Sequence, residues 1–189
     1  CHYKGGFDCV AIYLRNNPES RFFSKKGLIL GGSHSPSPLN SEAHQGDLSA
    51  VLLQNLNPLV NLIRVPKKPI ILMDEWESKI KAIVENTWNK DVNSLSGVPS
   101  WMLVLIKAVL KKTGREYLTD VWPNLEVFFH GGISFEPYRE QYKTLIPSNK
   151  MHYMETYNAS EGFFGLQDDP TDSSLLMMPD YGIFYEFIP

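Results

Sequence analysis

The sequence predicts an α/β fold in which a mostly parallel sheet is flanked by helices. Short apolar runs that end in glycine or polar residues alternate with longer segments whose apolar residues recur at helical spacing, as in βαβ units. Two strand-like runs close the chain around Pro179-Asp180-Tyr181-Gly182, which predicts an antiparallel C-terminal hairpin. No internal repeat or linker divides the 189 residues, so we expect a single α/β piece over residues 1–189.

The first half of the chain predicts one strand and two helices. The expected elements are a strand over residues 27–30, a helix over 47–56 and an amphipathic helix over 75–87. Asp47 can cap the first helix, because its carboxylate can accept a free backbone N–H. The loop Gly31-Gly32-Ser33, with Ser35 and Ser37 behind it, lacks the Gly-Lys-Ser/Thr ending of a P-loop. We interpret it as a connection between the strand and the next helix.

The second half continues the alternation. The expected elements are strands over residues 91–95, 125–129, 151–156, 174–178 and 183–187, and helices over 99–112 and 134–142. Pro99 suits the first turn of its helix, where its missing N–H costs nothing, and Gly114 ends that helix. The strand over 151–156 is expected to end close to Ala159, a small residue that allows a turn.

Composition excludes several classes of protein. The chain is 43% hydrophobic and 21% charged, the balance of an ordinary globular domain, and its net charge of −3 with no Lys/Arg-rich run argues against nucleic-acid binding. The longest apolar run, residues 101–106, is far short of the about twenty residues that span a bilayer, so we expect no membrane contact. Cys1 and Cys9 are too few for a disulfide framework, and no Cys/His cluster has metal-ligand spacing, which suits a reducing cytoplasm.

Residues 157–165, Tyr157-Asn158-Ala159-Ser160-Glu161-Gly162-Phe163-Phe164-Gly165, are the most informative stretch. They bring a hydroxyl and a carboxylate to the end of a predicted strand, where open α/β sheets tend to bind nucleotides. Gly131 and Gly132 follow the strand over 125–129, and adjacent glycines let a backbone approach a flat ligand closely. Each motif alone is also consistent with an ordinary turn, so the argument depends on their combination.

The order of motifs resembles the acyl-acid amido synthetases of the Gretchen Hagen three family. In chain order, the motifs are Gly97-Val98-Pro99-Ser100-Trp101, Trp122-Pro123-Asn124-Leu125, Tyr157-Asn158-Ala159-Ser160-Glu161 and the segment from Met178 to Pro189. The resemblance is clear over residues 92–189, less distinctive over 27–55, and indicates a bacterial member. It implies part of the large N-terminal domain of an acyl-adenylating (ANL superfamily) enzyme, whose Tyr-Gly-x-Thr-Glu motif corresponds to residues 157–161. Asn158 departs from this pattern, since these enzymes usually have Gly or Ala there.

The resemblance also implies that the chain is an internal piece. It begins with Cys and ends on Phe-Ile-Pro. The superfamily's phosphate-binding loop is expected before residue 1, and its Tyr-Arg-x-Gly-Asp motif and catalytic-lysine lid after residue 189. We therefore expect residues 1–189 alone to be inactive.

The resemblance implies ATP and Mg²⁺ as cofactors and assigns roles to the motif. Glu161 would hold Mg-ATP as the metal ligand, Ser160 would hydrogen-bond the α-phosphate, and Tyr157 would pack on the adenine. Glu161 and Ser160 are thus the catalytic candidates. The wider nucleotide-binding set is Gly131, Gly132, Thr156, Tyr157, Asn158, Ser160 and Glu161, and the candidates for the acyl-pocket wall are Val98, Trp101, Ile133, Phe163 and Phe164.

These roles predict an ATP-dependent acyl-acid ligase, which forms an acyl-adenylate from a carboxylic acid and transfers the acyl group to the amine of an amino acid. Two alternatives remain: an acyl-CoA ligase with a thiol acceptor, and a non-catalytic relative that binds small molecules. His130 and His152 could act as general bases, but adenylation needs none, and we interpret them as strand-end histidines. The acidic residues 168–172 lack the ligand set of a calcium loop, and we interpret them as a surface turn.

Overall fold

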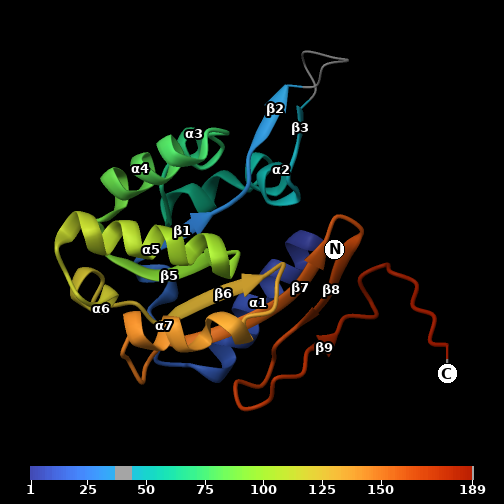
Figure 1. Ribbon diagram of the computed structural model, residues 1–189. Helices are drawn as coiled ribbons and strands as arrows, with labels where there is room; N and C mark the ends of the chain where they lie inside the picture. Colours follow the sequence, from blue (N-terminus) through green and yellow to red (C-terminus); the bar gives the residue numbers. More distant parts are fainter. Residues whose placement is uncertain (37–43, 189) are drawn as a thin grey trace.

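The structure, a computed structural model, describes residues 1–36 and 44–188 (Figure 1). Ser37, in the small-residue loop of the sequence analysis, lies outside the described residues, as does Pro189. The main sheet has seven strands in the order β4-β1-β5-β6-β7-β8-β9, and β2 and β3 form a separate antiparallel pair. The strands are β1 (Lys26–Leu30), β2 (His34–Pro36), β3 (His44–Gly46), β4 (Arg64–Val65), β5 (Val92–Gly97), β6 (Val127–Gly131), β7 (His152–Ala159), β8 (Gly162–Leu166) and β9 (Leu176–Met177).

Helices connect the parallel strands. The α-helices are α1 (His2–Asn16), α2 (Leu48–Gln54), α3 (Lys68–Ile71), α4 (Trp76–Thr87), α5 (Pro99–Thr113), α6 (Leu118–Val121) and α7 (Arg139–Leu145), and the 3₁₀ helices are η1 (Phe22–Ser24), η2 (Pro58–Leu62) and η3 (Glu136–Tyr138). Strands β4, β1, β5, β6 and β7 are parallel, and β8 and β9 are antiparallel to their neighbours. The predicted fold class is therefore confirmed.

Helix α5 shows how the sequence builds this layer. Pro99 occupies its first turn, and Gly114 ends it in the left-handed conformation, with φ of 64°. Leu105, Ile106 and Val109 are completely buried, whereas Val104 on the opposite face is 47% exposed. The helix is amphipathic and packs its apolar stripe on the sheet.

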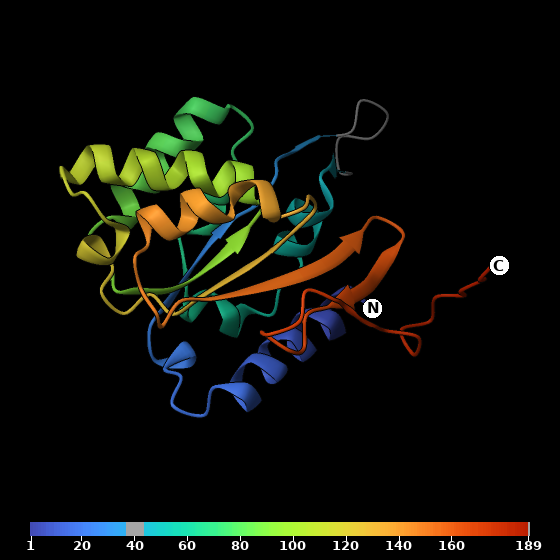
Figure 2. The same cartoon turned by 60° about the horizontal axis from the view of Figure 1, so that its bottom comes forward.

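Two apolar cores lie on opposite faces of the sheet. The larger includes residues of β1, β5, β6 and the helices α4 to α7, and the smaller joins α1 to β6, β7 and β8. Figure 2 shows α5 and α7 over one face and α1 under the other. Gly5 lets α1 approach closely, because a Cβ there would lie 2.4 Å from the ring of Phe163.

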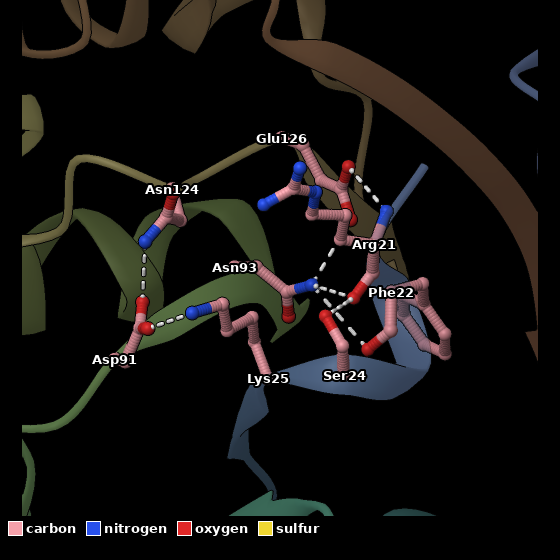
Figure 3. A network of polar contacts seen from close by, with 8 residues as sticks. All are labelled: Arg21, Phe22, Ser24, Lys25, Asp91, Asn93, Asn124 and Glu126. Carbon is pink, nitrogen blue, oxygen red and sulfur yellow. Dashed lines mark hydrogen bonds and ion pairs between the residues drawn. The ribbon is translucent and has the colours of Figure 1, made fainter. Parts of the chain in front are cut away.

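A polar network fixes the amino-terminal ends of β5 and β6 (Figure 3). Asn93, completely buried, donates from Nδ2 to the carbonyl oxygen of Arg21 at 2.9 Å and to Oε1 of Glu126 at 3.0 Å. Glu126 Oε2 accepts from the backbone N–H of Arg21, and Lys25 pairs with Asp91 beside them. The network holds η1 against the sheet at the edge opposite the predicted nucleotide site.

The predicted C-terminal hairpin is wrong in its position. Only Leu176 and Met177 of the predicted strand over 174–178 form a strand, and residues 183–187 form none. Phe184 and Phe187 are 89% and 75% exposed, and the apolar run that suggested a strand pairs with no strand within the described residues. The hairpin is formed instead by β7 and β8. Because β7 also pairs with β6, this hairpin is part of the main sheet, whereas an isolated two-stranded hairpin is at best marginally stable.

Other elements differ in detail. Helix α2 ends at Gln54, and Asp47 at its N-cap directs its carboxylate to the backbone N–H of Ser33 rather than into the helix. The helix expected from Ser134 begins as η3 and continues as α7. Helix α1 was not predicted from the sequence. In the described part of the chain, no helix has both the length and the apolar character needed to cross a bilayer.

Candidate functional site

The carboxyl ends of β1, β5, β6 and β7 meet at one edge of the sheet. In register, Leu30 pairs with Gly97, Gly97 with His130, and Gly131 with Thr156. Open α/β sheets bind ligands outside this edge. Gly132 leaves the sheet at this edge, whereas β7 continues beyond it through Ala159, so only Ser160 and Glu161 of the second motif lie outside the strands.

Gly131 and Gly132 have different structural reasons to be glycine. A Cβ at Gly131 would lie 2.3 Å from the carbonyl oxygen of Thr156, so the close packing of β6 on β7 already requires glycine there. Thr156 closes the contact by donating from Oγ1 to the carbonyl oxygen of His130 at 3.1 Å. Gly132 has φ of +83°, and a Cβ there would meet only Val98 Cγ2, at 3.6 Å. Gly132 therefore turns the backbone and leaves open space beside it.

Ser160 and Glu161 form the two-residue turn between β7 and β8. Ala159 pairs with Gly162 across the hairpin, and both turn side chains are exposed. Ser160 is the fourth residue after Thr156, which at about 3.3 Å per strand residue is a distance of about 13 Å. A ligand that reaches from Gly132 to Glu161 would therefore have to be extended.

Tyr157 and Asn158 lie between these two ends. The Tyr157 side chain is 56% exposed, and its ring centroid lies 5.0 Å from that of Phe164. A register shift between Tyr157 and Asn158 marks an irregularity in the β7–β8 ladder. Such irregularities redirect side chains at the rims of sheets.

The five predicted acyl-pocket residues lie on both faces of the sheet. Val98 is the N-cap of α5, Trp101 is 36% exposed beside Trp76, and Ile133 is 39% exposed after Gly132. Phe163, only 3% exposed, belongs to the core under α1, whereas its neighbour Phe164 is half-buried beside Tyr157. The structure therefore does not bring Phe163 together with Trp101, and the acyl pocket stays a prediction.

The family model for the GH3 family N-terminal domain matches residues 2–151. The chain belongs to the GH3 family. GH3 stands for Gretchen Hagen three, so the family inferred from the motifs is confirmed. No curated protein matches the chain. The GH3 match includes Val98, Trp101 and the Gly131-Gly132 pair but ends before the β7–β8 turn, so the roles of Tyr157, Ser160 and Glu161 stay predictions.

The loop 31–33 of this GH3 chain is held by a buried lysine that sequence reasoning missed. Lys79 on α4 is 2% exposed and donates from Nζ to the carbonyl oxygens of Gly31 and Gly32, at 2.7 and 2.9 Å. Ser49 Oγ accepts from the backbone N–H of Gly32 at 2.8 Å. Burial lowers the pKa of Lys79, and the nearby Asp47 carboxylate opposes that shift. The clamp fixes the loop after β1 at the same edge as Gly132.

His130 is a buried neutral imidazole. It is 3% exposed and stacks on Phe135 with ring centroids 4.2 Å apart, and desolvation lowers its pKa to about 3, helped by the positive charge of Arg139. His152, at the start of β7, packs its ring against Tyr13, and burial lowers its pKa. Both occupy strand ends, as expected. Neither adjoins Ser160 in sequence or register.

The acidic residues 168–172 form a turn held by their own side chains. Asp169 Oδ1 accepts from the backbone N–H of Thr171 at 2.8 Å, and Asp172 Oδ1 accepts from that of Ser174 at 2.9 Å. Within the described residues no group of three His, Cys, Asp or Glu side chains could hold a metal ion. The prediction of a surface turn is confirmed.

Proposed function

We propose that this GH3 chain carries the nucleotide-facing edge of an ATP-dependent acyl-acid ligase. The enzyme forms an acyl-adenylate from a carboxylic acid and transfers the acyl group to the amine of an amino acid. The proposal rests mainly on the sequence Tyr157-Asn158-Ala159-Ser160-Glu161, which resembles the adenylation motif. In this GH3 protein the motif leads into an exposed turn at the carboxyl edge of the sheet. Family membership fits acyl-acid amido synthetase activity in general.

The donors on this edge fit Mg²⁺ that arrives with ATP. Magnesium is usually bound by one or two carboxylates together with substrate phosphates, and seldom by an all-protein cage. Glu161 supplies one exposed carboxylate, and no cluster of three ligands exists among the described residues. When bound, Mg²⁺ would neutralise charge on the phosphate oxygens.

The chain's own residues would bind and orient the two reactants. Tyr157 exposes a ring on which adenine can stack, and Ser160 exposes a hydroxyl that can donate to an α-phosphate oxygen. Attack by the substrate carboxylate on the α-phosphorus then expels pyrophosphate. The amine next attacks the acyl carbonyl carbon, loses a proton and releases AMP. A hydrogen-bond donor beside the phosphate oxygens, where negative charge increases, stabilises the transition state of the adenylation step.

The proposal assigns the reaction to the cytoplasm, where free thiols stay reduced. Cys1 and Cys9 are both free in the structure. Cys9 is 3% exposed, and burial raises the pKa of its thiol to about 12, so it acts as a small apolar residue of the α1 core.

Product analysis of the full-length protein tests the proposal. The protein is incubated with ATP, Mg²⁺ and a panel of aromatic, indolic and aliphatic acids, with either mixed amino acids or CoA as acceptor. We expect an amide, AMP and pyrophosphate with amino acids. A thioester formed only with CoA would identify a CoA ligase instead. No product with any acid, despite measurable ATP binding, would indicate a non-catalytic binding protein.

A further inference from the structure

The tip of the β7–β8 hairpin, residues 157–162, extends beyond the rest of the main sheet. The last residue of β7 that pairs with β6 is Thr156, and β9 pairs with β8 only from Gly165 onward. Figure 1 shows the hairpin extending past the end of β6. Two paired strands alone are at best marginally stable. The turn residues Ser160 and Glu161 therefore need support from outside the sheet to keep a fixed orientation.

The segment 178–183 supports the tip from one side. Gly182, with φ of +79°, turns the backbone there. Ile183 then packs on the first residue of β8, because a Cβ at Gly162 would lie 2.5 Å from Ile183 Cδ1. Gly162 directly follows Glu161 in the chain, so this contact reaches the turn itself.

Helix α1 fixes this segment through Tyr181, which is only 8% exposed. The Tyr181 hydroxyl donates to the Asp8 carboxylate, and Lys4 Nζ lies 4.5 Å from the centre of the Tyr181 ring. Burial, together with the Asp8 carboxylate, raises the pKa of Tyr181, so the hydroxyl keeps its proton and donates. Lys4 also pairs with Asp180 at 2.7 Å, but both side chains are more than half exposed, and exposed ion pairs contribute little. The hydroxyl bond to Asp8 is therefore the main polar contact that holds the segment on α1.

Phe163, the second residue of β8, connects α1 to the same tyrosine. A Cβ at Gly5 of α1 would lie 2.4 Å from the Phe163 ring, so helix and strand are in close contact. The ring centroids of Phe163 and Tyr181 lie 5.9 Å apart. Helix α1, Tyr181 and the start of β8 thus form one packed unit beside the turn.

We propose that Tyr181 is a positioning residue for adenylation, which holds the hairpin tip so that Ser160 and Glu161 face the nucleotide. The inference rests on the proposed function and adds to it a residue that acts through the fold. The bond to Asp8 fixes the segment 178–183 on α1, and the packing of that segment on β8 sets the position of the turn. Loss of the Tyr181 hydroxyl should therefore loosen the nucleotide site without removing any of its side chains.

ATP–pyrophosphate exchange by the full-length protein tests this role in Tyr181→Phe, which keeps the ring and removes only the hydroxyl. We expect kcat/KM for ATP to fall by about 10-fold, mainly through a higher KM, because a hydrogen bond to a charged group is lost. The KM for the acid should stay unchanged, since the pocket candidates Val98, Trp101 and Ile133 do not belong to the hairpin. Partial unfolding would instead lower kcat and leave the KM for ATP unchanged, so the two constants separate positioning from stability.

Matched variants assign the effect to the bond between Tyr181 and Asp8. Asp8→Ala should reproduce Tyr181→Phe, whereas Asp8→Asn, whose amide oxygen can still accept from the hydroxyl, should keep most of the wild-type kcat/KM. The double variant Tyr181→Phe/Asp8→Ala should be no worse than either single variant. Tyr3→Phe is the control on the same helix, since the Tyr3 hydroxyl donates to the Leu52 carbonyl oxygen of α2 at 3.1 Å, and its KM for ATP should equal that of the wild type.

Hydrogen–deuterium exchange of the same proteins without ATP gives a second readout that does not depend on catalysis. The backbone amides of residues 157–164 should exchange about 10-fold faster in Tyr181→Phe than in the wild type or in Tyr3→Phe, because the tip opens more often. This readout separates failure of the present inference from failure of the proposed function.

Three results would overturn the proposal. One is an active Tyr181→Phe variant whose KM for ATP equals that of Tyr3→Phe. Another is deuterium uptake over residues 157–164 at the wild-type rate in Tyr181→Phe, which would leave Tyr181 as a packing residue of the core under α1. The third is a wild-type protein without pyrophosphate exchange for any acid, which would contradict the proposed function itself and with it any role of Tyr181 in adenylation.

Discussion

Gly131 packs against Thr156 so closely that a Cβ at residue 131 would lie 2.3 Å from the Thr156 carbonyl oxygen. The contact joins β6 to β7, the strand that leads into the candidate adenylation motif. Gly131→Ala should therefore lower the free energy of unfolding by about 1–3 kcal/mol, the usual cost of overpacking. Urea denaturation measures this loss. Gly6→Ala is the control, since a Cβ there meets nothing within 4 Å and alanine favours a helix by up to about 1 kcal/mol.

The buried lysine of α4 should be important for stability. Lys79→Met removes both hydrogen bonds to the loop 31–33 and leaves two carbonyl oxygens unsatisfied, so we expect a loss of about 2–4 kcal/mol. Lys81→Met, on the same helix but exposed, should change stability by less than about 0.5 kcal/mol. Equal losses in the two variants would show that the clamp does not act as described.

Two tyrosines that share one aromatic cluster should differ in how loss of the hydroxyl changes the stability of the protein. Tyr142 donates its hydroxyl to the Pro99 carbonyl oxygen at 2.8 Å, so Tyr142→Phe should cost about 1–2 kcal/mol. The Tyr153 hydroxyl is buried and has no hydrogen-bond partner in the described part of the chain, so Tyr153→Phe should leave the stability unchanged or raise it by up to about 1 kcal/mol. Thermal unfolding of both variants checks the contrast.

The buried imidazole of β6 should make the fold sensitive to acid. The pKa of His130 falls from 6.5 in the unfolded chain to about 3 in the folded protein, so between these values only the unfolded chain binds the proton. Stability is therefore complete above pH 6.5 and falls as the pH decreases toward 3. The slope approaches about 1.4 kcal/mol per pH unit for this one group. His130→Gln should remove that slope, and the difference between wild type and variant at pH 5 and pH 7 measures it. An identical pH dependence in both proteins would contradict the burial of a neutral His130.

Local patterns predicted the elements that carry their own signals. The helix after Pro99 has a proline start, an apolar stripe and a glycine end, and all three lie within 16 residues of sequence. The strand from residue 26 to 30 and the strand leading to Ala159 were likewise evident from apolar runs bounded by turn residues.

Register and packing, by contrast, depend on residues far apart in the chain. The contact of Gly131 with Thr156 and the pairing of His130 with Glu155 each join residues 25 positions apart, so no local pattern reveals them. The strand expected over 183–187 failed because apolar alternation does not supply a neighbouring strand. The missed helix α1 contains Gly5 and Gly6, which weaken its helical signal, although Gly5 is needed where the helix meets Phe163.

The most direct test of the proposed adenylation is ATP–pyrophosphate exchange by the full-length protein with a responsive acid. The Glu161→Gln variant is compared with Glu140→Gln, an exposed carboxylate on α7. If Glu161 holds the metal-bound nucleotide, exchange should depend on the acid, should fall by about 100-fold in Glu161→Gln, and should be unchanged in Glu140→Gln. Exchange of equal rate in both variants would contradict the assignment of the β7–β8 turn to catalysis.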